Sequence, residues 1–346
     1  MKSPASTSSP IKVGIILLAV AVFLLIASYF LSMFIGVALL FTPAGIEFGL
    51  GNSSFLIQFL SVWVVFVFCF VAAWKVRRSI REVVSKAFRS PSARLFDNWL
   101  FAMPIIASAL WFVVSSIIDL QNLLNVPTGN LPAPVTDAET FELYLGLTRA
   151  PAIEELAFRV IPIGIIVLAQ LLLTQESSGG SVQPEKPRMK LALFSFLFPD
   201  KAKRLAGVDN VEAKGIVKGI SKDEWLILLF TSVVFAVAHI ISGAGWQTGK
   251  VTSTFVQGLV FGVVFLAYGF HASILLHWFF NYYFYTIELG SYYLGWSLNA
   301  FLWIDTLTQW LGVISTVFFI FVMLRMLIPK KQKASAEPIS IATESP

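Results

Sequence analysis

The sequence predicts an all-α protein, a polytopic membrane helix bundle of about eight transmembrane helices. Of its 346 residues, 57% are hydrophobic and only 13% are charged, and the mean hydropathy is +0.78. A soluble domain carries roughly a quarter charged residues and cannot hide this much apolar surface. Long apolar runs alternate with short basic segments, so a lipid environment explains both the apolar excess and the placement of the charges.

A helix that crosses the hydrocarbon core needs about 20 apolar residues. Eight segments qualify: 12–38, 54–74, 98–119, 141–174, 225–243, 251–269, 271–289 and 301–328. The sixth and seventh are separated only by residues 268–270, where Gly269 forms either a tight turn or a kink in one long helix. The apolar run 11–41 is about twice as long as the core of a signal peptide, which is about 7–15 residues, so we expect a retained span.

The distribution of basic residues predicts how these spans are oriented. If all eight cross the membrane and both termini are cytoplasmic, the cytoplasmic side holds 22 of the 25 Lys and Arg residues. The outer loops then hold only Lys250, while Arg149 and Arg159 lie within the fourth span. The positive-inside rule describes this asymmetry, so we expect cytoplasmic termini. The net charge of +5 therefore reflects membrane topology, and nucleic acid is not an expected partner.

Composition divides the chain into four parts. These are three spans with a basic loop (1–140), a helical core (141–290), a final span (291–328) and a polar tail expected to be disordered (329–346). Within the core, segment 176–224 is long, basic and contains glycine, which is typical of a cytoplasmic linker. The apolar stretch 191–198 inside it is too short to span, so it lies either in the membrane interface or against the bundle.

The fourth span contains three charged residues close together, Glu154, Glu155 and Arg159. An ionisable group inside the bilayer costs several kcal/mol unless it is paired, so these charges require a reason. Glu155 and Arg159 are four residues apart and share a helix face, which predicts an ion pair. Glu154 points about 100° away and must find a partner on another helix. A network that only fixes helix register is the alternative, but two carboxylates with one arginine leave a surplus negative charge, which suits a general base.

Two further spans supply polar residues at helical spacing. The fifth carries Phe235 and His239, and the seventh carries His277 and Asn281, which are four apart and share a face. A single histidine in a span is more often a satisfied polar residue than a ligand, but all three histidines of this chain lie in or at the ends of spans. The third, His271, lies about 240° around the helix from His277, so we expect it at the interface or behind the site.

The candidate site therefore comprises Glu154, Glu155, Arg159, His239, His277 and Asn281. A carboxylate and an imidazole could activate water for attack on a carbonyl, while a second imidazole and an amide donate hydrogen bonds to the oxyanion. Glu154, His239 and His277 could instead hold zinc, which lowers the pKa of its bound water. The zinc interpretation has no His-Glu-x-x-His motif behind it, and the one cysteine, Cys69, excludes a cysteine-ligated metal site.

At these residues the sequence resembles the CAAX protease and bacteriocin-processing (CPBP) family of intramembrane proteases, which includes the Rce1-type prenyl endopeptidases. The family pattern is Glu-Glu-x-x-x-Arg, then Phe-x-x-x-His, then His-x-x-x-Asn, each on a different span. The chain matches it at 154–159, 235–239 and 277–281, in the same order. The resemblance covers roughly residues 141–290, and three short motifs in order are more specific than any one of them.

This resemblance implies a glutamate-dependent intramembrane endopeptidase. It implies that Glu154 activates the water with help from His239, that His277 and Asn281 form the oxyanion hole, and that Glu155 and Arg159 support them. It requires no cofactor, with zinc as the alternative. The expected partners are a peptide or a lipidated, including prenylated, protein substrate and membrane lipid. The oligomeric state stays open. The expected location is a membrane, the cell membrane if the chain is prokaryotic.

Two other functions fit buried glutamates in a membrane bundle. A proton-coupled transporter would use them as a relay, but it is expected to show repeated or inverted halves, and the sequence shows no repeat. A membrane scaffold or immunity factor would keep the same fold without catalysis. The completeness of the three motifs favours the peptidase over both.

Overall fold

The computed structural model describes residues 9–51, 53–79, 81–83, 85, 95–131, 133–177, 188–296 and 298–327. Among these residues there is no strand, and the one extended pairing is an isolated bridge between Gly129 and Trp246. Seven helices of this described part are long and apolar enough to cross a membrane, at 17–39, 54–75, 99–123, 137–174, 222–241, 250–268 and 299–325. The prediction of an all-α polytopic bundle is confirmed.

The helices follow one another with short connections. They are α1 (Ser9–Leu39), α2 (Pro43–Gly51), α3 (Ser53–Lys75), η1 (Leu95–Asp97), α5 (Trp99–Leu123), α6 (Asp137–Glu155), η2 (Leu156–Val160), α7 (Ile161–Ser177), α8 (Arg188–Leu197), α9 (Pro199–Ala206), α10 (Val211–Gly219), α11 (Lys222–Ile241), α12 (Lys250–Tyr268), α13 (Phe270–Trp278), η3 (Phe279–Tyr283), α14 (Phe284–Tyr293) and α15 (Leu298–Leu327). Helices α6 and α11 both begin with a capping box, Thr136 with Glu139 and Ser221 with Glu224, which satisfies their first backbone N–H groups.

The seventh predicted span, 271–289, is present as a helical run in three pieces. Helix α13 continues through the π-helical segment η3 into α14, so no single piece is as long as the seven helices above. Gly269 separates this run from α12 with a backbone φ of 104°, in the region that favours glycine. A Cβ atom there would lie 2.6 Å from the carbonyl oxygen of Leu197. The residue therefore forms a turn between two helices, and the count of about eight spans holds.

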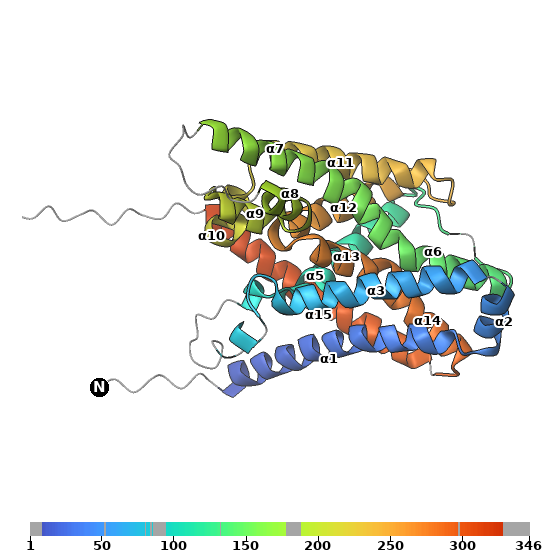
Figure 1. Cartoon of the computed structure of the whole chain (residues 1–346). Coiled ribbons are helices and arrows are strands. Elements are labelled where there is room, and N and C mark those ends of the chain that lie inside the picture. The colour runs from blue at the N-terminus through green and yellow to red at the C-terminus, as the bar shows by residue number, and fades with distance from the viewer. Residues whose placement is uncertain are drawn as a thin grey trace, which may run out of the picture.

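The long helices lie side by side, with α2 at one end of the bundle and α8, α9 and α10 at the other (Figure 1). The start of α1 and the end of α15, in red, both lie at the end where α8–α10 gather (Figure 1). Both ends of the described chain therefore leave the bundle on one side, as an even number of crossings requires. The predicted cytoplasmic location of that side stays a prediction.

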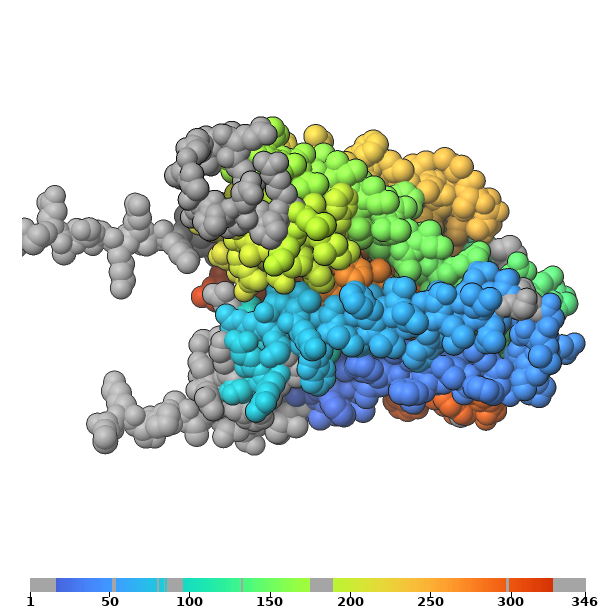
Figure 2. Space-filling view, viewed as in Figure 1, coloured from blue at the N-terminus to red at the C-terminus, as the bar shows by residue number. Residues whose placement is uncertain are grey.

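Helix α13 occupies the centre of the bundle, and all of its residues are buried. It packs against α3, α6, α12 and α5, and on the face shown in Figure 2 it is visible in orange only between α8 and α3. Large apolar side chains of the surrounding helices, among them Phe23, Phe34, Val64 and Phe230, point outward. In a water-soluble protein such a surface would be unstable, but in a membrane it contacts lipid.

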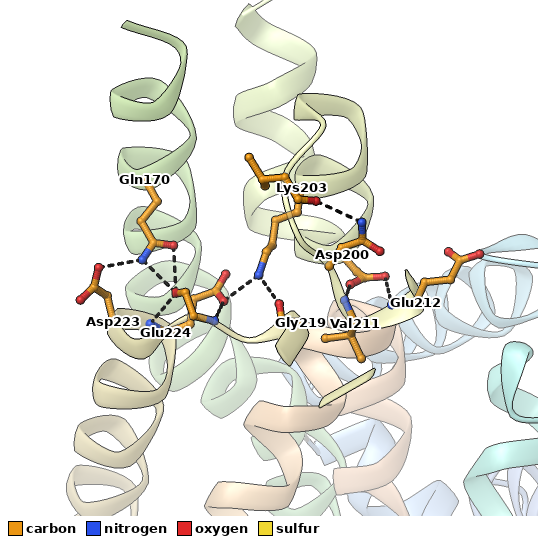
Figure 3. A network of polar contacts seen from close by, with 11 residues as sticks. Gln170, Asp200, Lys203, Val211, Glu212, Gly219, Asp223 and Glu224 are labelled. Atoms are coloured by element: carbon orange, nitrogen blue, oxygen red, sulfur yellow. Dashed lines mark hydrogen bonds and ion pairs between the residues drawn. The ribbon is translucent and has the colours of Figure 1, made fainter. Parts of the chain in front are cut away.

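The segment 176–224, predicted as a linker, contains three short helices packed on the bundle. In α8, Leu191 is buried and Phe194 and Phe196 pack against the core, so the stretch 191–198 lies against the bundle. A polar network then joins α9, α10 and the start of α11 (Figure 3): the Lys203 ammonium donates to Glu224 at 2.8 Å and to the carbonyl oxygen of Gly219. The sequence pattern missed this packing because each helix is short. Residues 178–187 and the tail 329–346 lie outside the described residues.

Candidate active site

Both glutamates lie where the fourth span changes its helical geometry. Helix α6 ends at Glu155, and the next five residues, with Arg159 among them, form the π-helical segment η2. A second π-helical segment, η3, begins two residues after His277 and contains Asn281. Such wider turns insert an extra residue into a helix and occur frequently at functional sites. Two of the three motifs therefore coincide with a local distortion of their helix.

Glu155 is completely buried and has three polar partners. Its Oε1 accepts a hydrogen bond from Nη1 of Arg159 at 3.2 Å and faces Nδ1 of His277 at 2.8 Å. Its Oε2 accepts a hydrogen bond from the hydroxyl of Ser273. The ion pair predicted from the four-residue spacing is confirmed, and the other two partners come from α13. Glu155 thus joins the fourth span to the centre of the bundle.

Arg159 is held by aromatic rings as well as by its carboxylate. The guanidinium carbon lies 4.2 Å from the ring centroid of Phe235 and 5.5 Å from that of Phe261. A desolvated guanidinium over an aromatic face is stabilised by the negative potential of the ring. The phenylalanine of the Phe-x-x-x-His motif is therefore in contact with the arginine of the Glu-Glu-x-x-x-Arg motif.

His277 lies between the two glutamates. Since Nδ1 faces the Glu155 carboxylate, which only accepts hydrogen bonds when ionised, Nδ1 carries a proton and donates it. Nε2 lies 3.6 Å from Oε2 of Glu154 and 3.3 Å from Nδ2 of Asn281. The ring centroid of Phe261 is 4.7 Å away on one face. Contacts on both nitrogens and on the ring face fix the orientation of the imidazole.

Glu154 lies at the boundary between this buried cluster and the outside of the bundle. Its side chain is 29% exposed, and its neighbours Ile153 and Leu156 are exposed apolar residues. Its Oε2 atom is nevertheless buried, and no described residue forms a hydrogen bond with it. A buried carboxylate oxygen that lacks a partner is costly, which marks this atom as one that a substrate or a water molecule would satisfy.

His239 contributes a nitrogen from a third helix. Its Nδ1 lies 2.8 Å from the carbonyl oxygen of Phe235, and because a carbonyl oxygen only accepts, Nδ1 is the protonated nitrogen of the neutral ring. The lone pair is then on Nε2. The ring centroid of Phe235 lies 4.7 Å from that of His239 and 5.8 Å from that of His277. The three motifs predicted from separate spans therefore meet in one region.

Residues 136–283 match the family described as type II CAAX prenyl endopeptidase Rce1-like. The match covers less than half of the chain and supports assignment of this region to that family. The match includes all six candidate residues and lies close to the core predicted at 141–290. No curated protein and no solved structure matches the chain significantly. The chain is thus a multi-pass membrane protein with an Rce1-like domain of the CAAX intramembrane protease type.

The sequence names Glu154, His239 and His277 as an alternative zinc site. Among the described residues, no group of three or more His, Cys, Asp and Glu side chains is placed to hold a metal ion. Of the three residues named for zinc, His277 directs Nδ1 to Glu155 and His239 directs Nδ1 to a backbone carbonyl, which leaves Nε2 of both rings as the nitrogen that could bind a metal. Zinc therefore stays the alternative that the sequence predicts, and we derive no step through a metal.

Sequence reasoning missed one polar residue of the Rce1-like domain and left the place of another open between two positions. Ser273 was not considered, although it precedes His277 by four residues and therefore shares its helix face. His271 was expected at the interface or behind the site. It is 1% exposed and packs against Phe198 and Phe270, at the junction of α8 and α9. Its Nδ1 is buried, and no described residue forms a hydrogen bond with it.

Proposed function

We propose that the Rce1-like domain hydrolyses a peptide bond in a lipid-modified or membrane-associated substrate, with a water molecule activated by Glu154. The observation that carries this proposal is the buried Oε2 of Glu154, which no described residue satisfies by a hydrogen bond and which lies 3.6 Å from Nε2 of His277. A carboxylate oxygen kept free of other partners in a largely desolvated site is able to accept a proton from water.

In the proposed reaction, Glu154 takes one proton from the water. The lone pair on Nε2 of His239 accepts a hydrogen bond from the other O–H group of the same water and so orients the water molecule. The water oxygen attacks the peptide carbonyl, and the carbonyl oxygen becomes an oxyanion. Protonated Glu154 then gives its proton to the leaving amine nitrogen. The C–N bond breaks, the carboxylate of Glu154 is restored, and no other reactant is needed.

His277 and Asn281 are the donors we assign to the oxyanion. The Nδ1 proton of His277 is committed to Glu155, so this ring can donate to the oxyanion only when Nε2, 3.6 Å from Oε2 of Glu154, carries a proton as well. In this structure Nε2 accepts a hydrogen bond from the amide Nδ2 of Asn281 at 3.3 Å, so this amide is a donor already in place beside it. Donors that are already oriented stabilise developing negative charge without reorganisation, which is often a large part of catalysis.

The surroundings of Glu154 favour a substrate that arrives from the lipid. Three apolar side chains near the site are exposed on the surface of the bundle. They are Ile153 on α6, Leu156 on η2 and Val237 on α11. An acyl or prenyl chain attached to a peptide would lie along such a surface while the peptide reaches the carboxylate. A peptide without a lipid would lack that contact.

The test is cleavage of a fluorogenic farnesylated CAAX peptide by the purified protein in lipid nanodiscs. We expect Glu154→Gln and His239→Ala to abolish cleavage, while Glu142→Gln, an exposed glutamate on the same helix α6, keeps it. Full activity of Glu154→Gln would overturn the mechanism. The same peptide without the farnesyl group tests the substrate class separately, because equal rates would remove the role assigned to the lipid.

A further inference from the structure

A small cavity of about 20 Å³ lies at the end of the bundle where α8–α10 gather. It is enclosed by the residues that follow α3, by α9, by the start of α10 and by the end of α12. Its charged and polar lining comprises Arg77, Asp200, Lys201, Arg204, Glu212 and Tyr268. None of these residues takes part in the site around Glu154, so the cavity requires its own explanation.

Arg77 forms the floor of the cavity with unused hydrogen-bonding capacity. Its side chain is 11% exposed, and its Nη2 lies 3.6 Å from Oδ2 of Asp200. Its Nε is buried, and no residue of the described chain accepts a hydrogen bond from it. The guanidinium carbon lies 4.6 Å from the ring centroid of Tyr268. The backbone φ of 64° is rare for a residue with a side chain, so the chain is held in a strained turn that brings this guanidinium inward.

The acidic residues of the lining are already engaged by other groups. The two carboxylate oxygens of Asp200 accept hydrogen bonds from the backbone N–H groups of Val211 and Glu212 at 2.5 and 3.2 Å. Glu212 pairs with Arg204 at 2.5 Å. Lys201, by contrast, contacts the Phe194 ring at 4.3 Å and has no carboxylate partner within the described ranges. Three basic against two acidic side chains leave the cavity with a surplus positive charge.

The position of the cavity corresponds to the edge of the hydrocarbon layer. The membrane span of α3 ends at Lys75, just before Arg77, and that of α12 ends at Tyr268. The basic loops of the sequence lie at this same end, on the side that the charge distribution predicts to be cytoplasmic. Anionic lipids concentrate in the cytoplasmic leaflet, and basic pockets at that level are suited to their headgroups.

The wall formed by α9 is fixed before any ligand binds. Asp200 joins α9 to the start of α10, and Lys203 joins α9 to Glu224 at the start of α11 (Figure 3). Lys201 and Arg204 are on this same short helix and are exposed at the rim. The cations are therefore presented by a rigid element, which lowers the entropy cost of binding.

We propose that this cavity binds the phosphate group of an anionic phospholipid headgroup. The Nε of Arg77 and the ammonium of Lys201 donate to the phosphate oxygens, and Arg204 shares its guanidinium between Glu212 and the ligand. Arginine and lysine are the side chains that phosphate oxygens prefer. Inorganic phosphate offers the same oxygens, so the test must distinguish the two sources.

The test is native mass spectrometry of the full-length protein after incubation with phosphatidylglycerol or with phosphatidylcholine. We expect retention of phosphatidylglycerol over phosphatidylcholine, and a loss of roughly fivefold in that preference for each of Arg77→Gln and Lys201→Gln. Lys218→Gln, an exposed basic residue on α10 outside the lining, is the matched control and should keep the preference. Equal retention of the two lipids, or an unchanged preference in Lys201→Gln, would overturn the proposal.

Two further measurements separate the alternatives. Added inorganic phosphate at millimolar concentration should not displace phosphatidylglycerol. If phosphate displaces the lipid from the unmodified protein but not from Lys201→Gln, free phosphate is the ligand of this cavity and the lipid assignment is overturned. If Arg77→Gln fails to fold because its turn is strained, Lys201→Gln decides alone, because that side chain is exposed at the rim. Thermal unfolding in phosphatidylcholine confirms that each variant is folded.

Discussion

Nδ1 of His277 donates a hydrogen bond to Oε1 of Glu155 at 2.8 Å, while Nε2 of the same ring lies 3.6 Å from Oε2 of Glu154. Two adjacent glutamates, about 100° apart on their helix, thus reach opposite nitrogens of one imidazole. Their environments differ: Glu155 is fully buried with three partners, and Glu154 is at the lipid-facing boundary. We therefore assign positioning to Glu155 and proton transfer to Glu154.

This assignment predicts different consequences for two similar substitutions. Glu155→Gln removes the charge partner of the buried Arg159, so we expect a loss of stability of about 3–5 kcal/mol together with the loss of activity. Glu154→Gln removes only a partly exposed carboxylate, so we expect lost turnover with stability changed by less than about 1 kcal/mol. Thermal unfolding in nanodiscs, paired with the peptide assay, measures both. Equal destabilisation by the two variants would contradict the separate roles.

Ser273 is expected to act on the reaction through Glu155. Ser273→Ala removes the hydroxyl that donates to Oε2 of Glu155, so the carboxylate holds His277 less firmly. We expect kcat to fall about tenfold with KM nearly unchanged, because a single lost hydrogen bond costs about 1–3 kcal/mol at a buried acceptor. Ser291→Ala is the control, since that hydroxyl bonds only to the carbonyl of Ile287 one turn back. An equal effect at both serines would indicate a general packing defect.

The metal-free mechanism makes a prediction about chelators. Because the proposed reaction activates water with the side chains of Glu154 and His239 alone, we expect full activity after 1,10-phenanthroline or EDTA treatment and gel filtration. Metal content by plasma mass spectrometry should show less than about one tenth of an equivalent of zinc per chain. Inactivation by chelation that zinc alone reverses would return Glu154, His239 and His277 to the role of ligands.

Local geometry explains which parts of this molecule were predictable from sequence. The Glu155–Arg159 pair follows from a spacing of four on a helix, and the shared face of His277 and Asn281 follows likewise. The length of the apolar runs was enough to predict the spans. The asymmetry of the basic residues predicts the orientation of the spans, and the fold does not test that prediction. Motif order then placed three spans around one site.

The remaining features depend on contacts between distant segments. The π-helical turns at 156–160 and 279–283 arise where α6 packs against α13 and η3, which no local pattern encodes. The hydrogen bond of Ser273 to Glu155 and the burial of His271 against Phe198 also need the folded bundle. The helices α9 and α10 were missed, because short amphipathic segments resemble a basic linker until they pack.

Gly269 provides the last prediction, because its turn sets α13 relative to α12. Gly269→Ala must accommodate a side chain at φ 104° with a Cβ atom 2.6 Å from the carbonyl oxygen of Leu197 and 2.7 Å from Phe198. We expect a loss of at least about 2 kcal/mol in stability, since strain and backbone overlap add. Activity should fall with it, because α13 carries both Ser273 and His277.

The matched control is Gly146→Ala in α6, where a Cβ atom meets nothing within 4 Å. That change should be neutral or stabilise the protein by up to about 1 kcal/mol, because alanine favours helix. Thermal unfolding of the two variants in the same lipid gives the comparison. If Gly269→Ala unfolds at the same temperature as Gly146→Ala, the turn at Gly269 does not fix the position of α13. The placement of His277 between the two glutamates would then depend on other contacts of α13, such as the hydrogen bond from the Trp278 indole to the carbonyl oxygen of Thr148.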